Sequence, residues 1–197
     1  MVLVIDTSSA RSALALVEDG RPVAEDVVAA SREPDLPRRL AALADPARLT
    51  GVGISLGPGS FTGLRAGVSF GVGLAMGLRV PLWGLDPLIL QAARSPEPAT
   101  ALVEAGRGRI FWLEPGAAAP RHGEPAELPR ELPAIGWLRP ATADAVRAAG
   151  VRLLGDEEAA PFAAAAATQL RKARKLGYGT VSLRYMESFA PLRGQSW

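Results

Sequence analysis

The sequence predicts an α/β protein with mixed sheets, arranged in two lobes. Strand-like apolar segments open the chain, and from residue 49 onward strand-like and helix-like segments alternate. This order is typical of a sheet that mixes parallel and antiparallel strands. The proline-rich stretch 95–98 precedes a new pair of strand-like segments, which indicates a boundary. We therefore expect a first lobe over residues 1–95 and a smaller, more irregular lobe over residues 96–197.

The first lobe is expected to open with an antiparallel meander. Residues 2–5 form an apolar run suited to a central strand, and extended segments over 11–17 and 22–30 follow it. Glu18-Asp19-Gly20-Arg21, between these two segments, is typical of a hairpin turn. Three neighbouring antiparallel strands are the simplest arrangement of such segments.

Helices and strands are then expected to alternate. Asp35 can cap a short helix with Leu36, Leu40 and Leu43 on one face, which Asp45-Pro46 would end. The segments that follow are a strand, a long helix, a short strand and a short helix, over residues 49–56, 60–77, 80–83 and 86–94.

The second lobe is expected to contain less regular structure. Two strands over 101–104 and 109–113 are joined by a glycine turn, and the proline-rich segment 116–140 is expected to be loop. The alanine-rich residues 159–175 predict a long helix ended by Gly177. The segment from residue 182 onward is expected to be irregular.

The composition excludes several classes of chemistry. The 197 residues include no cysteine and one histidine, which rules out disulfides, thiolate zinc sites and metal sites built on paired histidines. The N-terminus lacks the basic start and the cleavage site of a signal peptide. We therefore expect a cytoplasmic protein without a metal centre of its own.

The most informative segment is the glycine-rich stretch after residue 56. Gly59, Gly63, Gly67 and Gly71 lie four residues apart and would form a stripe on one helix face. A glycine inside a helix costs roughly 0.5 to 1 kcal/mol relative to alanine, so close packing must offset that cost. We interpret the stripe as a packing face, either within the chain or toward a partner.

Two other interpretations of this stretch are weaker. The apolar segment between Arg65 and Arg79 is shorter than the roughly 20 residues that a membrane-spanning helix needs, so no membrane contact is expected. A phosphate-binding loop would carry the dinucleotide glycine pattern or a P-loop ending in Lys-Ser/Thr, and this stretch has neither.

Polar residues follow two of the predicted strands. Asp6-Thr7-Ser8-Ser9 follows the first strand, and Glu104-Ala105-Gly106-Arg107-Gly108 ends the strand over 101–104. Carboxylate, hydroxyl and backbone amide groups can hold a metal-bound water and phosphate oxygens; the same residues are also ordinary turn formers. Facing one cleft, the two loops would form a phosphate clamp, and Gly155-Asp156-Glu157 could add a third loop.

The sequence contains no recognisable catalytic apparatus. His122 lies in the proline-rich segment without an orienting partner, so we expect it to be exposed and not to belong to a Ser-His-Asp triad. A two-metal nuclease would need further carboxylates beside Asp6, and the first lobe offers no obvious second one at a strand end.

Basic residues gather near the C-terminus, although the net charge is only +2. Arg171, Lys172, Arg174 and Lys175 fit a solvated helix end, whose dipole favours cations. They also fit a contact with nucleic acid. Both interpretations stay open at this point.

Four segments resemble the TsaB (YeaZ) family, which takes part in the threonylcarbamoyladenosine modification of tRNA. They are Leu3-Val4-Ile5-Asp6-Thr7-Ser8, Gly57-Pro58-Gly59-Ser60-Phe61-Thr62-Gly63-Leu64-Arg65 with the helix after it, Val80-Pro81-Leu82-Trp83-Gly84-Leu85, and residues 101–112 with their Glu-Ala-Gly-Arg-Gly core. The glycine segment is the most specific. The resemblance is strong over residues 1–113 and thin afterwards.

The resemblance implies an actin-like ATPase (RNase H-like) fold of two α/β lobes with mixed sheets. It also implies a non-catalytic role in bacteria. In this family the related TsaD transfers the threonylcarbamoyl group to the adenosine beside the tRNA anticodon, and TsaB binds TsaD and activates it. ATP and a metal ion would then belong to the catalytic partner, further subunits would join the complex, and tRNA would be contacted indirectly or weakly.

By the same resemblance, the short helix and the glycine helix form a surface for homodimerisation or for TsaD. The residues of this expected interface are Leu36, Leu40, Leu43, Gly59, Phe61, Thr62, Gly63, Leu64, Gly67, Val68 and Gly71. The residues of a vestigial nucleotide site would be Asp6, Thr7, Ser8, Ser9, Glu104 and Gly106.

The chain departs from the family pattern in three places. Residues 31–46 form a shorter segment than usual, and Glu104 stands where aspartate is usual. Gly155-Asp156-Glu157 lacks small residues that would receive an adenine ring, so independent ATP binding is not expected. The main alternative is an actin-like ATPase or small-molecule kinase in which Asp6 and Glu104 handle magnesium and phosphate. A peptidase would depend on His122 alone.

Overall fold

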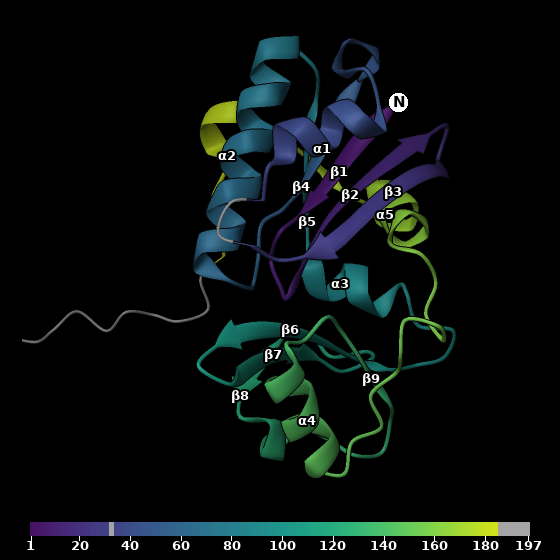
Figure 1. Cartoon of the computed structure of the whole chain (residues 1–197), viewed down its shortest axis with the longest axis vertical. Helices are drawn as coiled ribbons and strands as arrows, with labels where there is room; N and C mark the ends of the chain where they lie inside the picture. Colours follow the sequence, from purple (N-terminus) through teal and green to yellow (C-terminus); the bar gives the residue numbers. More distant parts are fainter. Residues whose placement is uncertain (32–33, 185–197) are drawn as a thin grey trace, which may run out of the picture.

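The computed structural model describes residues 1–31 and 34–184, which form two sheets joined through helix α3 (Figure 1). The strands are β1 Val2–Asp6, β2 Arg11–Glu18, β3 Arg21–Ala29, β4 Gly51–Ser55, β5 Leu82–Leu85, β6 Thr100–Gly106, β7 Arg109–Leu113, β8 Arg121–Gly123, β9 Ala134–Ile135 and β10 Arg174–Leu176. The helices are α1 Leu36–Leu43, α2 Phe61–Leu78, α3 Pro87–Ala92, α4 Pro140–Ala148 and α5 Phe162–Leu170, with 3-10 turns η1 Pro46–Arg48, η2 Pro125–Glu127 and η3 Tyr178–Thr180.

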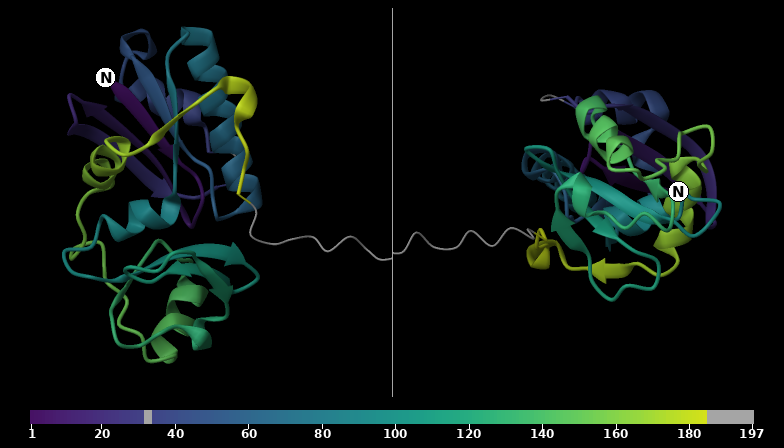
Figure 2. Two further views of the ribbon diagram at one scale, coloured as in Figure 1. Left: turned by 180° about the vertical axis from the view of Figure 1, so that it is seen from behind. Right: turned by 90° about the horizontal axis from the view of Figure 1, so that it is seen from below.

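The larger sheet is mixed, as the sequence predicts. β1, β2 and β3 form the expected antiparallel meander, and β4 and β5 join β1 in parallel. β10 pairs antiparallel with β5 at the edge, which gives the order β10-β5-β4-β1-β2-β3. Figure 2 shows from behind how the chain returns to this sheet through α5 and β10.

Side-chain alternation gives this sheet two apolar faces, since successive side chains on a strand point to opposite sides. Leu3 and Leu14 pack on the face covered by α1 and α2. Val4, Ala13 and Ala15 pack on the opposite face, against α5. The small side chains of β2 allow the alanine-rich helix to lie close to the sheet.

The smaller sheet has the order β8-β7-β6-β9 and is mixed as well, because β6 pairs antiparallel with β7 and parallel with β9. Trp112 and Val146 share the core between one face and α4. On the other face, Leu88 of α3 packs against Phe111. Helix α3 therefore lies between the two sheets (Figure 1).

Two stretches differ from the sequence-based expectations. Residues 116–140 contain β8, η2 and β9, whose strands are too short to show local alternation and pair with distant strands. The expected helix over 159–175 is wrong in its extent, because α5 ends at Leu170 and the chain continues as β10. The alanine-rich composition gave no signal for this change from helix to strand. Helix α4 has no counterpart among the expected elements.

The start of α1 and the lobe division also differ in detail. Asp35 directly precedes α1, as expected, but its side chain makes no capping hydrogen bond to the helix. Its backbone is left-handed (φ 41°). Helix α5 and strand β10 pack with the larger sheet although they lie in the expected second lobe of residues 96–197. We therefore propose that the first lobe combines residues 1–95 with residues 162–176. Of the segment that was expected to be irregular from residue 182 onward, residues 185–197 lie outside the described residues.

Among the described residues, α2 is the one helix that is long and apolar enough, by length and composition, to cross a membrane. Its glycine-bearing face packs on the chain's own sheet, where Gly71 lies against Ile54.

Candidate functional site

A cavity of about 560 Å³ lies where the turn after β1, the N-terminus of α2 and the second lobe meet. Arg139 closes it from the second lobe. Hydroxyl side chains dominate the rest of the wall and come from Thr7, Ser9, Ser12, Ser31, Ser60 and Thr62. The first predicted polar loop therefore does reach a cavity between the lobes.

Asp6 ends β1 beneath this cavity and is fully buried. Its Oδ1 accepts a hydrogen bond from the Ser8 amide at 3.0 Å, whereas Oδ2 has no hydrogen-bond partner among the described residues. Burial raises the pKa of Asp6, and the interaction with Ser8 opposes that rise only in part. Asp6 does not line the cavity. The carboxylate is therefore sealed from an entering phosphate.

The hydroxyl groups beside Asp6 are used within the protein. Thr7 Oγ1 donates to the carbonyl of Gly63 at 2.7 Å, and Ser9 Oγ donates to the carbonyl of Trp137. The Ser60 amide donates to the carbonyl of Ser8 at 2.7 Å. This turn fastens α2 and the second lobe to the end of β1.

Glu104, the carboxylate of the second predicted loop, is also engaged. It is buried, and Oε1 accepts the Arg139 amide at 2.9 Å while Oε2 lies 3.3 Å from Arg139 Nε. The amide of Glu104 donates to Ser9 Oγ at 3.4 Å. Gly106 takes a left-handed backbone (φ 84°) at the turn, where an added Cβ would meet nothing. The two loops do meet, but Glu104 faces Arg139.

The third loop joins the lobes. Asp156 accepts hydrogen bonds from Arg94 Nη2 at 2.8 Å and from Trp137 Nε1 at 3.2 Å, and it pairs with Arg11 Nη2 at 2.5 Å. The Arg94 guanidinium also lies 4.4 Å from the centre of the Trp137 ring. Burial raises the pKa of Asp156, but these hydrogen bonds and the Arg11 charge outweigh burial and lower it.

A nucleotide with magnesium does not fit this arrangement. The carboxylate of Asp6 is sealed, Glu104 is paired with Arg139, and Asp156 is paired with arginines. Within the described part of the chain, no three His, Cys, Asp or Glu residues lie close enough to hold a metal ion. The vestigial nucleotide site stays a prediction, as does the expected lack of independent ATP binding.

The glycine stripe of α2 packs within the molecule. An added Cβ would overlap the carbonyl oxygen of Thr7 at Gly63, Thr7 Oγ1 at Gly67 and an Ile54 methyl group at Gly71. At Gly59 it would overlap the backbone of Ser8. The expectation that the stripe itself contacts a partner is therefore corrected, because the end of β1 and strand β4 already occupy it.

The other predicted interface residues divide into two groups. Leu36, Leu40 and Leu64 are buried in the core, and Leu43 is partly buried against it. Phe61 and Thr62 are exposed and Val68 is half-buried on α2. The residues of the second group lie on or beside the outer face of α2.

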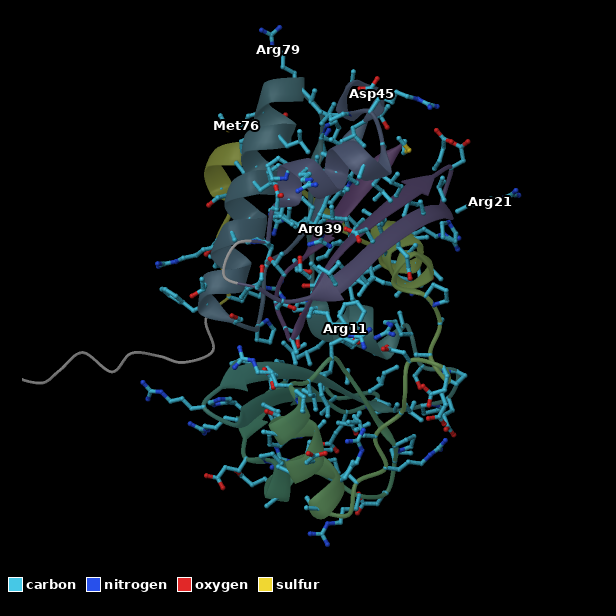
Figure 3. The ribbon with its side chains drawn as sticks, in the orientation of Figure 1. Arg11, Arg21, Arg39, Asp45, Met76 and Arg79 are labelled. Atoms are coloured by element: carbon cyan, nitrogen blue, oxygen red, sulfur yellow. The ribbon has the colours of Figure 1, made fainter. Side chains whose placement is uncertain are left out.

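The outer face of α2 is apolar and open. Phe61 is 44% exposed and Met76 is 53% exposed, and Met76 lies on the side of α2 away from the sheet (Figure 3). Arg65 lies over the Phe61 ring, 3.7 Å from its centre. A groove of about 730 Å³ runs between this face and the segment after β10, lined by Val68, Ser69, Val72, Gly73, Met76, Tyr178, Val181, Ser182 and Leu183. We call these residues, with Phe61, the α2 surface.

His122 lies in β8 and not in a loop. Its ring stacks on Phe111 with ring centres 4.6 Å apart, and the residue is half-buried. The expected exposure of His122 is therefore wrong. The sequence did not reveal that His122 lies in a strand paired with β7, because a strand of three residues is too short to recognise.

The side chains of the C-terminal basic residues lie in three different places. Arg171 donates to the carbonyl of Gly20 at 3.0 Å. Lys172 and Arg174 line a second cavity together with Arg184, whereas Lys175 lines a separate small pocket beside Arg79. Sequence reasoning missed Arg94, Arg139 and Trp137, whose partners lie far away along the chain and leave no local signal.

A family model described as "TsaD: tRNA N6-adenosine threonylcarbamoyltransferase" matches residues 41–123. The chain is 40% identical over 63 residues to the tRNA threonylcarbamoyladenosine biosynthesis protein TsaB of Escherichia coli (strain K12). This match covers 29% of the chain and 27% of that protein. The uncharacterized protein Rv3421c of Mycobacterium tuberculosis is 34% identical over 80 residues, which covers 39% of the chain and 38% of that protein. The matched segments thus span less than half of these curated relatives.

The fold is similar to solved structures over almost its whole length. YeaZ from Pseudomonas aeruginosa superimposes with a TM-score of 0.69 at 18% identity, over 94% of the chain and 99% of that protein. A structure titled as an uncharacterized protein with similarity to peptidase YEAZ, also from Pseudomonas aeruginosa, gives 0.65 at 17% identity over the same shares. These likenesses confirm the expected actin-like fold.

Proposed function

We propose, from the premise that this chain belongs to the TsaB (YeaZ) family, that it is a non-catalytic subunit of a bacterial threonylcarbamoyladenosine complex. Its role is to bind a TsaD-like catalytic subunit and make that subunit competent to modify the adenosine beside the tRNA anticodon. The coarser assignment to the threonylcarbamoyladenosine pathway rests on the names of the relatives.

The observation that carries this proposal is the α2 surface. It combines large exposed side chains, Phe61 and Met76, with a neighbouring groove. Exposed apolar patches of this kind mark protein interaction sites, since burying them removes apolar area from water. The glycine stripe supports the surface from behind, because it holds α2 tightly on the chain's own strands.

The non-catalytic role is supported by how the polar groups are used. Thr7 holds α2 and Ser9 holds the second lobe in place, Glu104 is paired with Arg139, and Asp6 is buried beneath the cavity. General acid–base catalysis needs a titrating group within reach of the substrate. We therefore propose that ATP and a metal ion bind to the catalytic partner. We also propose that this chain acts in the cytoplasm.

Other subunits of the same complex would join through the catalytic partner. A second copy of this chain is the competing occupant of the α2 surface, so homodimerisation and partner binding should exclude each other. Competition of this kind would show as a loss of homodimer when the partner is added.

Reconstitution tests the proposal. Purified chain and its TsaD-like partner should together form modified tRNA much faster than the partner alone, and the chain alone should form none. Mass spectrometry of digested tRNA gives the product yield. Product formed by the chain alone, or a partner whose rate is indifferent to the chain, would contradict the proposal.

A further inference from the structure

Acidic residues are missing from both walls of the α2 surface. The chain has 20 aspartate and glutamate residues, but the stretches 46–85 and 159–184 contain none. The first stretch includes α2, and the second supplies the other wall of the groove. Tyr178 fastens this second wall to the end of α2, since its hydroxyl donates to the carbonyl of Val80 at 2.6 Å. The two acid-free stretches therefore lie side by side.

Arginines stand at both ends of this apolar surface. Arg65 lies one turn after Phe61, and Arg79 follows α2 directly, one turn after Met76 (Figure 3). Both arginines are exposed, and about 21 Å of helix separates them at 1.5 Å per residue. In the described part of the chain Arg79 makes no ion pair, and it shares a small pocket with Lys175. The α2 surface is thus an apolar strip with a cation at each end.

The stacking of Arg65 suits it to a carboxylate. Its Cζ lies 3.7 Å from the centre of the Phe61 ring, so the ring contacts the flat face of the guanidinium. The N–H donors of a guanidinium lie in its plane and match the two oxygens of a carboxylate. The stack therefore holds the guanidinium in place and leaves its plane suited to an acidic group.

A second copy of this chain fits this charge pattern poorly. In a dimer with two-fold symmetry, the same patch stands on both sides of the interface. Neither side would then supply a carboxylate for Arg65 or Arg79, because the patch contains none. Like charges brought together across an interface oppose binding. The charge pattern therefore favours a partner whose surface differs from that of this chain.

A protein fits the surface better than a nucleic acid does. Between the two arginines the outer face of α2 carries Val68, Val72 and Met76, which offer bases no aromatic ring to stack on. Surfaces that bind single-stranded nucleic acid combine a cationic groove along the backbone with aromatic stacking platforms. An apolar centre with a charged rim is typical of protein interfaces.

We propose, building on the partner contact assigned to the α2 surface, that this surface selects an acidic protein partner over a second copy of the chain. The partner's docking face presents an apolar centre, with carboxylates opposite Arg65 and Arg79. Complementary charges of this kind speed association and suppress wrong partners. Opposite salt dependences follow, because salt screens attraction in one complex and repulsion in the other. Salt weakens the complex with the partner and strengthens self-association.

Stopped-flow association of the full chain with the TsaD-like partner tests the first half of the proposal. At low salt, Arg79→Glu should lower the association rate constant at least about threefold, because repulsion replaces steering by complementary charge. Arg65→Glu should act in the same direction. The difference from the parent chain should vanish near about 1 M salt, where the screening length falls to about 3 Å.

The matched control is Arg21→Glu. It reverses the same charge at an exposed position on β3, at the opposite edge of the larger sheet from β10, and Arg21 and Arg79 lie far apart in Figure 3. We expect this control to keep the association rate constant within about twofold of the parent value, because a distant charge is screened.

Sedimentation of the full chain without the partner tests the second half. Self-association of the parent chain should be weakest at the lowest salt, where repulsion between the two patches is least screened. Arg79→Glu should strengthen self-association at low salt, since its carboxylate can face Arg65 of the second copy. Arg21→Glu should not.

The possible contrary results are distinct. Association with the partner that is indifferent to salt and to Arg79→Glu would overturn the charge recognition and leave the proposed function standing. A parent homodimer that is tightest at the lowest salt would also overturn it. Labelled single-stranded RNA that loses affinity for Arg79→Glu, with unchanged partner kinetics, would assign the cations to nucleic acid instead. A partner that does not bind the parent chain would overturn the proposed function together with this inference.

Discussion

At the scale of single residues, the buried carboxylate of Asp6 stands out. Its Oδ2 lacks a hydrogen-bond partner among the described residues, and burial raises its pKa above the ordinary value of 3.8. A group whose folded-state pKa is raised binds protons more readily in the folded state, so its contribution to stability falls as the pH rises from 3.8 through the folded value. Asp6 therefore destabilises the folded chain at neutral pH.

Replacing Asp6 by asparagine should remove this cost. Asp6→Asn keeps an oxygen for the Ser8 amide and cannot ionise, so we expect a higher melting temperature than that of the parent chain at neutral pH. The gain should shrink as the pH falls toward 3.8, where the parent carboxyl takes up its proton. Thermal unfolding followed by circular dichroism measures both.

The control for this prediction is Asp144→Asn. The Asp144 side chain is 75% exposed and forms only an (i, i+3) pair with Arg147, so its replacement should change stability little at either pH. An Asp6→Asn variant that melts below the parent chain at neutral pH would contradict this prediction and show that the interactions with Ser8 and Ser55 outweigh the cost of burying the carboxylate.

At the scale of elements, α2 carries glycines with two different roles. Gly63 lies against the Thr7 carbonyl, where an added Cβ would overlap backbone, whereas a Cβ at Gly73 would meet nothing. We expect Gly63→Ala to destabilise the fold by about 1 to 3 kcal/mol or more, as overpacking does. Gly73→Ala should stabilise it by about 0.5 to 1 kcal/mol, because alanine is the better helix former.

Denaturant unfolding of the two variants distinguishes these roles. Equal effects of Gly63→Ala and Gly73→Ala on the free energy of unfolding would mean that the stripe does not pack on the end of β1. Because both changes add one methyl group to the same helix, helix propensity alone cannot separate them.

The same elements show what the sequence can predict. The meander β1–β3 and helix α2 carry local signals, namely an apolar run, a hairpin turn and the glycine spacing, and these elements were predicted. The glycine spacing predicted that something packs closely on α2. It did not identify the end of β1 and strand β4 as the packing elements, because spacing along one helix carries no information about its neighbours. β8, β9 and β10 were missed, since each has two or three residues and pairs with a distant strand.

The candidate site was predictable only in part. The turn after β1 and the end of β6 were singled out as two polar loops that would form a phosphate clamp if they faced one cleft, and they meet through Ser9 and Glu104. Glu104 pairs with Arg139, and Asp156 of the third loop pairs with Arg94 and Arg11; no pattern in the sequence links these arginines to their carboxylates. Arg11 lies at the junction of the two lobes, and Arg39 fastens β3 to α1 (Figure 3).

At the scale of the whole molecule, the two lobes are held by polar contacts on both sides of the junction. Ser9 of the first lobe donates to the carbonyl of Trp137 and accepts the amide of Glu104, and Asp156 of the second lobe pairs with Arg94 and Arg11 of the first. Of the three carboxylates in the predicted polar loops, Asp156 thus links the two lobes, whereas Glu104 pairs within the second lobe and Asp6 is buried. The outside of the first lobe carries the α2 surface, which these contacts leave exposed.

The central claim is that the α2 surface binds the catalytic partner, and Met76→Lys tests it most directly. Lysine keeps helix propensity but places a charge on a side chain that is 53% exposed on this surface. The matched control is Val23→Lys, at a position on β3 that is 55% exposed. Isothermal titration of the TsaD-like partner should show at least about tenfold weaker binding for Met76→Lys, a loss of about 1.4 kcal/mol, and unchanged binding for Val23→Lys. A folded Met76→Lys variant that binds with the parent affinity would contradict the account.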